Sequence, residues 1–187
     1  MNRYALPVSA ETKAALAKLC AGVRTIGIIG RAKGLEGVFG CVLQTAAGEV
    51  VEVRAEQHDL EYKFEVFPIA AKIVSTFANA EEARPFRLPS PVGVLLLATE
   101  DWLDPGIPCD GALGQNPIMQ CQGRPGEAPS GAVAACRYFG GIELRGSDGA
   151  TLVVATLPFP FAIHVSGVPG TGAIDRETYS GVTAGEA

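Results

Sequence analysis

Strict alternation of apolar and polar residues is the feature that most limits how this chain can fold. In the stretch GVFGCVLQTAAGEVVEVRAE, a turn ends at Gly48, and Val51, Val53 and Ala55 then alternate with charged residues. Successive side chains of a strand point to opposite faces of a sheet, so a period of two indicates a strand with one buried face. A glycine-bearing turn between two such runs predicts a β-hairpin.

Two further stretches show the same period. In HDLEYKFEVFP the apolar side chains fall on one side of an extended chain and the charged ones on the other, which predicts one half-buried antiparallel strand. In GGIELRGSDGATLVVATLPFPFAIHVSG the turn GSDG joins two alternating runs. Residues 38–55 and 138–156 also share a Phe-Gly pair, a leucine and a turn glycine. We interpret them as two ordinary hairpins, and a duplicated module is the alternative.

Helical spacing occurs in two places. In VSAETKAALAKLCAG, Ser9 is a suitable N-cap, Leu16, Leu19 and Cys20 share a face, and Gly22 can end the helix. In IAAKIVSTFANAEEA, the apolar side chains that recur at helical spacing predict a second helix over about 69–81; they are Ile69, Ile73 and Phe77.

These patterns together predict an α+β fold. We expect a mainly antiparallel β-sheet built from hairpins, with the N-terminal helix and the helix at about 69–81 packed on one face. The chain has 187 residues, of which 48% are hydrophobic, which fits one domain with a real core. We expect this domain over residues 1–171, with a long irregular loop rich in Pro and Gly at about 101–130 and a mobile polar tail at 172–187.

Charge and hydropathy argue against several classes of function. The formal net charge is -5, and the basic residues are scattered, whereas a nucleic-acid or anionic-membrane binder needs a concentrated basic face. The longest apolar runs are too short or too interrupted by proline to cross a bilayer, and no targeting segment is evident. We therefore expect a soluble, cytoplasmic protein.

The cysteines and glycines give no cofactor or metal signature. The five cysteines are widely spaced, with no C-x-x-C pair and no Cys/His zinc spacing, so most of them are expected to be small buried hydrophobes. The glycine-rich stretch RTIGIIGRAKGLEG does not match either phosphate-binding pattern, because Lys33 precedes its glycine and more strand follows. No cofactor is evident and no metal site is favoured.

The stretch ATEDWLDPGIPCDG, residues 98–111, is the first candidate site. It follows the apolar run VGVLLLATE, and the loops that follow strands often carry binding groups. The ligand-binding candidates here and just beyond are Asp101, Trp102, Asp104, Asp110 and Arg124. Aspartates also form ordinary turns, and a tryptophan often anchors a loop to the core. We give turn chemistry the greater weight.

A catalytic reading has weaker support. His164 alternates with apolar neighbours near a strand end, where a histidine can act as a general base, and Cys109 and Asp101 are its candidate partners. No nucleophile motif accompanies them. The sequence favours a non-catalytic binding or assembly module, monomeric or homo-oligomeric, whose partner is a protein or a second copy rather than nucleic acid. The alternative is a small enzyme, or a binder of a small molecule or metal, that uses the acidic 98–124 segment with His164.

Overall fold

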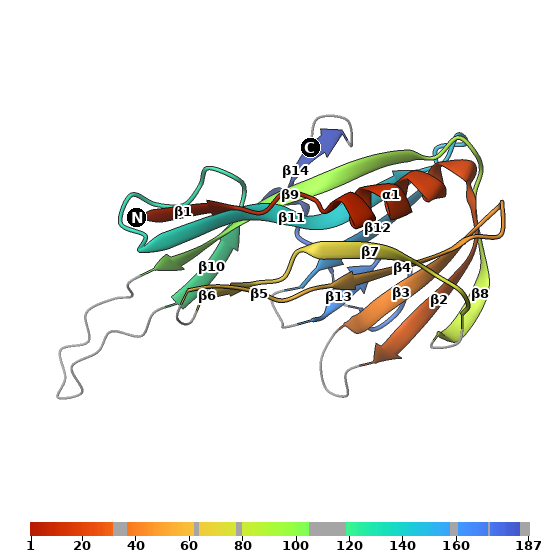
Figure 1. Ribbon diagram of the computed structural model, residues 1–187, viewed down its shortest axis with the longest axis horizontal. Coiled ribbons are helices and arrows are strands. Elements are labelled where there is room, and N and C mark those ends of the chain that lie inside the picture. The colour runs from red at the N-terminus through yellow and green to blue at the C-terminus, as the bar shows by residue number, and fades with distance from the viewer. Residues whose placement is uncertain are drawn as a thin grey trace.

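The computed structural model describes residues 1–31, 37–61, 64–77, 80–104, 119–157, 161–171 and 173–183 (Figure 1). Within these residues there is one α-helix, α1 (Ala10–Lys18), which continues into a 3₁₀ turn at Leu19–Ala21; another 3₁₀ turn spans Arg176–Thr178. The strands are β1 (Asn2–Ala5), β2 (Val23–Arg31), β3 (Val38–Thr45), β4 (Val50–Ala55), β5 (His58–Glu61), β6 (Phe64–Val66), β7 (Ile69–Val74), β8 (Glu81–Leu88), β9 (Gly93–Asp104), β10 (Met119–Gly123), β11 (Ala134–Arg145), β12 (Thr151–Thr156), β13 (Ile163–Val165) and β14 (Ser180–Thr183).

Two antiparallel meanders form the body of the molecule. The first meander is β2-β3-β4-β7, and the second meander is β9-β11-β12-β13. They join where Ile163 of β13 pairs with Val38 of β3. Further strands extend the edges: β8 pairs with β2, β10 and β14 pair with β9, and β1 runs parallel to β11. The prediction of a mainly antiparallel sheet built from hairpins is confirmed.

The two meanders correspond residue by residue in their central hairpins. The cross-strand pairs that face the core are Cys41–Val53 and Leu43–Val51 in the first, and Ile142–Val154 and Leu144–Leu152 in the second. Phe67 and Phe161 each lie two residues before the last strand of their meander, and their rings pack edge to face with centroids 5.3 Å apart. Equal registers and a contact between equivalent residues favour a duplicated module over two unrelated hairpins.

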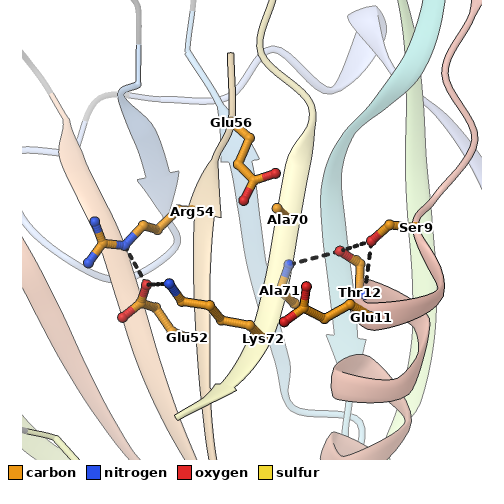
Figure 2. Close-up of a pocket in the computed structure, with 9 residues that line it drawn as sticks. All are labelled: Ser9, Glu11, Thr12, Glu52, Arg54, Glu56, Ala70, Ala71 and Lys72. Carbon is orange, nitrogen blue, oxygen red and sulfur yellow. Dashed lines mark hydrogen bonds and ion pairs between the residues drawn. The ribbon is translucent and has the colours of Figure 1, made fainter. Parts of the chain in front are cut away.

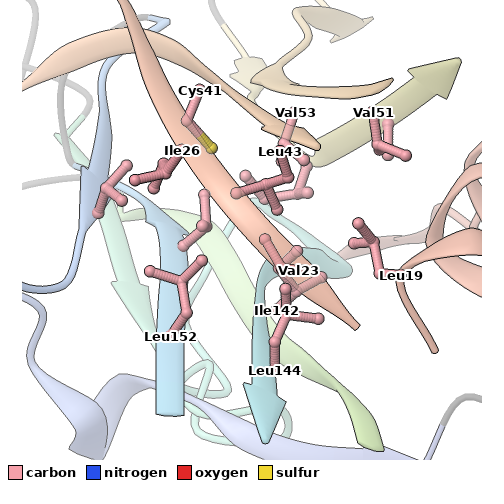
Figure 3. Packing of buried hydrophobic residues seen from close by; sticks show 14 of the residues in the cluster. Leu19, Val23, Ile26, Cys41, Leu43, Val51, Val53, Ile142, Leu144 and Leu152 are labelled. Carbon is pink, nitrogen blue, oxygen red and sulfur yellow. The ribbon is translucent and has the colours of Figure 1, made fainter. Parts of the chain in front are cut away.

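The shared core lies between the inner faces of the two meanders (Figure 3). Leu43, Ile142 and Leu144 are fully buried there, together with Leu19 from the turn after α1. Each such side chain stabilises the fold by about 1.5–3 kcal/mol through the apolar surface that it removes from water. Alternation explains this arrangement, because one face of each strand supplies only apolar residues.

The predicted N-terminal helix is confirmed. Ser9 caps α1, since its side chain accepts a hydrogen bond of 3.1 Å from the backbone N–H of Thr12. The Oγ1 of Thr12 accepts a hydrogen bond of 3.2 Å from the backbone N–H of Ala71, so the helix satisfies a donor of β7 that β4 does not use. The chain leaves the helical segment at Gly22, where φ is +97°.

The predicted helix at about 69–81 is wrong. Residues Ile69–Val74 form β7, which pairs with all of β4, and residues Glu81–Leu88 form β8. The apolar spacing misled because Ile73 is 51% exposed, so the three residues at helical spacing do not share a buried stripe. Ile69 and Ala71 instead alternate into the core, and the pairing with β4 outweighs local helical propensity.

Two other segments differ from expectation. The stretch HDLEYKFEVFP is a two-stranded hairpin, β5-β6, rather than one strand. Within the loop expected at about 101–130, β9 continues to Asp104 and pairs with β10, which begins at Met119. The pairing of β9 with β10 forms strands in a region where the turn residues of the sequence predicted an irregular loop.

The C-terminal part of the described chain packs on the second meander. The segment expected to be a tail contributes β14, which pairs with β9, and Tyr179, which is buried against Leu97, Val153 and Ala155. We call residues 173–183 the cover segment. Among the described helices, none is long and apolar enough to cross a bilayer.

Candidate functional site

Asp101, the centre of the sequence-based site, lies in the middle of a sheet rather than on a loop. It belongs to β9, between Gln122 of β10 and Cys136 of β11, and is 5% exposed. Its Oδ1 accepts a hydrogen bond of 3.0 Å from the Tyr138 hydroxyl, and its Oδ2 accepts one of 2.8 Å from Gln120.

The surroundings of Asp101 change its pKa in both directions. Burial raises the pKa of Asp101 to about 6, against the hydrogen bonds from Gln120, Tyr138 and Gln122, which lower it. The Gln120 amide also donates to the backbone carbonyl of Glu65, at 2.7 Å, and so links the network to the β5-β6 hairpin. This arrangement ties the hairpin to the sheet.

The neighbours of Asp101 also have structural contacts. Trp102 and Asp104 are half-buried in β9, and the ring of Trp102 lies over Gly123, where an added Cβ would be 2.8 Å from it. Arg124 is exposed, and its side chain donates to the backbone carbonyl of Glu177 in the cover segment. Cys109 and Asp110 lie outside the described residues.

The structure does not bring Asp101 and His164 together. His164 lies on β13, two strands beyond β11, and its Nδ1 is 3.3 Å from the Thr171 hydroxyl. By register the two residues are about 14 Å apart across the sheet and about 16 Å apart along it. A general base must lie within hydrogen-bond reach of its partner, so these two do not form a catalytic pair.

The buried cysteines are poor nucleophiles. Burial and, to a smaller extent, nearby carboxylates raise the pKa of both Cys41 and Cys136 to about 12. Cys121 is partly exposed, and its pKa is also raised by burial and then by Asp104 and Asp101. Cys20 is exposed.

A second arrangement, which the sequence did not reveal, concerns the outer faces of the two meanders. In each central hairpin one glutamate faces one valine across the strands: Glu52 opposite Val42 in the first meander, and Glu143 opposite Val153 in the second. Both glutamates are buried, at 5% and 3% exposure. Each has an arginine two residues later on the same face, Arg54 and Arg145 respectively.

In the second meander this glutamate is covered by the chain itself. Glu143 Oε1 lies 2.7 Å from Arg145, and Glu143 Oε2 accepts a charge-assisted hydrogen bond from Arg176 of the cover segment. Burial raises the pKa of Glu143, but the hydrogen bonds from Arg176 and Arg145 outweigh it, and the net pKa is lowered. The carboxylate is therefore ionised and held by two guanidinium groups.

In the first meander, the described residues leave the equivalent region open. Phe77 and Ala80 cover one end of the outer face, where they pack on Ile29, Val42 and Val50. Two adjoining cavities lie beside this covered part and share Glu52, Arg54 and Lys72. The narrow cavity, of about 50 Å³, is also lined by Ser9, Glu11, Thr12 and Glu56, and the wide cavity, of about 520 Å³, by Val42, Ile73, Val74, Ser75 and Thr76. We call the two together the outer-face groove.

Glu52 lines both cavities of this groove, and Figure 2 shows its contacts with Arg54 and Lys72. Arg54 Nε approaches Glu52 Oε1 to 2.6 Å, and Lys72 Nζ approaches the same oxygen to 3.3 Å. Glu52 Oε1 and Arg54 Nε are buried, and in the described part of the chain neither makes a hydrogen bond, so their contact is an ion pair alone. A buried carboxylate with incomplete hydrogen bonding costs stability, so its place in the fold calls for an explanation.

Sequence reasoning missed Glu52 because its strand reads as a half-buried one with charges toward water. The only available signal was the pattern Glu-x-Arg, which occurs once in each central hairpin: as EVR at 52–54 on the second strand of the first hairpin, and as ELR at 143–145 on the first strand of the second. Among the described residues no group of three or more His, Cys, Asp or Glu side chains is arranged to hold a metal ion. Comparison of the chain with protein-family models, curated proteins and solved structures gave no significant match.

Proposed function

We propose that the protein is a non-catalytic binding module, and that its outer-face groove binds an extended segment of a protein partner. One observation carries this proposal: the two meanders share one plan, yet the outer face of the second is covered by residues 173–183, whereas that of the first holds an open groove around Glu52. A face that the chain covers with its own peptide in one half suits a foreign peptide in the other.

The groove has the mixed character of a peptide site. The half-buried Val74 supplies apolar surface on the same face as Glu52 and Lys72, which supply charge. Ile73, which is 51% exposed, also lines the wide cavity. Apolar contacts give area and a few placed charges give orientation, which is the usual division in peptide recognition.

Selection from a library of displayed random peptides tests this function. Peptides selected on the folded protein are expected to lose binding in the variant Ile73→Asp, which puts a charge on the apolar side of the groove. The matched control is Val133→Asp, at a residue that is 46% exposed and distant in sequence from the groove. Selected peptides that bind both variants as tightly as the unaltered protein would place the binding surface elsewhere.

A further inference from the structure

The charges of the groove identify the side chain that it receives. Resting on the proposed function, we infer that the partner segment carries an arginine whose guanidinium enters the narrow cavity and binds the carboxylate of Glu52. The occupant is thus a basic segment of another protein, recognised by the positive charge and by the planar fork of arginine.

The molecule contains its own precedent for this contact. On the equivalent face of the second meander, the buried Glu143 takes one arginine of its own hairpin on Oε1 and one arginine of the cover segment, Arg176, on Oε2. Glu52 likewise takes the arginine of its own hairpin, Arg54, on Oε1. Lys72 reaches the same oxygen, and no contact to Oε2 is drawn in Figure 2. Among the described residues, an arginine from outside the hairpin is the contact that Glu143 has and Glu52 does not.

The net charge of the narrow cavity also favours an arginine as its occupant. Three glutamates line it, Glu11, Glu52 and Glu56, against two basic residues, Arg54 and Lys72, which leaves one negative charge in excess. One guanidinium would balance the site. Because Glu52 is buried, a charge-assisted hydrogen bond to it is stronger than one at the open surface.

The two cavities differ in size, so each one fits a different part of the ligand. The narrow cavity, about 50 Å³, has room for a small polar group such as a guanidinium rather than for a length of peptide. The wide cavity, about 520 Å³, adjoins it and carries the exposed Ile73 and the half-buried Val74. The aliphatic stem of the partner's arginine and the residues next to it in the partner would lie in the wide cavity. The cover segment gives the precedent, because Tyr179, near Arg176, packs on Leu97 and Val153.

The test uses the peptides selected on the folded protein, each made in two forms, with arginine and with citrulline, which keeps the shape and removes the charge. We expect citrulline to weaken groove-dependent binding at least tenfold in fluorescence anisotropy. We expect Glu52→Gln to remove that difference, whereas Glu65→Gln, at an exposed residue of β6, keeps it. Glu11→Gln is a second variant, at an exposed residue that does not endanger folding, and is expected to reduce the difference.

The outcomes separate the inference from the proposed function. Groove-dependent peptides that contain no arginine, or that bind equally well with citrulline, would overturn the inference and leave the peptide-binding function in place. An absence of any groove-dependent peptide would overturn both. A dimer of the unaltered protein that Glu52→Gln dissociates would identify the occupant as a second copy, and would overturn the assignment to another protein.

Discussion

The hydroxyl of Tyr138 donates a hydrogen bond of 3.0 Å to Oδ1 of Asp101, across two neighbouring strands and out of contact with solvent. Tyr138 is itself 2% exposed, and its hydroxyl accepts a hydrogen bond from Gln122. The pair therefore puts an ionisable carboxyl group in the interior with a defined set of partners, and its titration can be read in the stability of the fold.

Stability is expected to fall as the pH rises from about 4 to about 6. The pKa of Asp101 is raised from 3.8 to about 6 in the folded protein, so the native state binds more protons than the unfolded state in this window. The contribution is fully present below the lower value and is lost by the upper one. It amounts to about 3 kcal/mol, from about 1.4 kcal/mol per pKa unit.

Asp101→Asn isolates this contribution from the other carboxyl groups. Urea unfolding at several pH values should show that the free energy of unfolding of the variant, relative to the unaltered protein, rises by about 3 kcal/mol between about pH 3 and about pH 7. Asp104→Asn, on the same strand, is the control. A difference that stays constant with pH would show that Asp101 titrates normally.

Tyr138→Phe is expected to raise the pKa of Asp101 further. The hydrogen bond from Tyr138 lowers that pKa, and the variant removes it while the burial remains. The carboxyl carbon shift of Asp101, followed by NMR against pH, measures the change. Tyr4→Phe is the control, because the Tyr4 hydroxyl donates to Glu61 instead. An unchanged midpoint in Tyr138→Phe would contradict the geometry.

Arg176→Ala is expected to loosen the cover segment. The variant leaves the buried Glu143 with Arg145 alone, and because Arg176 is half exposed, the loss should be about 1 kcal/mol. Hydrogen exchange should then be about fivefold faster at the β14 amides that pair with β9. Arg137→Ala, at an exposed residue of β11, should leave exchange unchanged. Equal exchange in both variants would show that Arg176 does not hold the segment.

Gly140→Ala is expected to destabilise the protein by about 1–3 kcal/mol through overpacking. Gly140 lies in the irregularity of β11 between Phe139 and Gly141, and an added Cβ would lie 3.0 Å from side-chain atoms of Thr99 and Thr156 and 3.1 Å from the Tyr179 ring. Urea unfolding measures the loss. Gly131→Ala, whose Cβ would meet nothing within 4 Å, is the matched control and should be nearly neutral.

The elements set by local patterns could be predicted from the sequence. The N-terminal helix has its cap at Ser9 and its end at Gly22, and the hairpins around Gly48 and the turn GSDG have alternation on both sides. In each case the determining residues lie within a few positions of one another.

The wrong predictions concern segments whose structure is set by pairing with strands that are distant in the sequence. Residues 69–74 have apolar spacing that suits a helix, but β4 offers a full row of backbone partners, and only the folded chain shows this. Asp101 and Asp104 have the pattern of turn residues, yet β9 continues to Asp104 because it pairs with β10 on one side and with β11 on the other. Buried carboxylates in a strand have no local signature, because burial depends on what the rest of the chain lays over them.

The same limit applies to the candidate site. The alternation around Glu52 and Glu143 is what any half-buried strand shows, so the sequence placed both residues toward water. Their burial follows from Arg54 and Lys72 in one half and from the cover segment in the other. The correspondence between the two hairpins helps to find the candidate site only when the strand registers are known.

The cover segment also sets how many partners one chain can hold. A peptide that is tethered beside the face it occupies acts at an effective concentration in the millimolar range. A free peptide of ordinary affinity, present at a much lower concentration, does not displace it. Under the proposed function, residues 173–183 would act as a tethered competitor on the second meander, and the described residues would offer one receptive face, on the first meander. A protein with one such face would mark or mask one segment of a partner without bridging two.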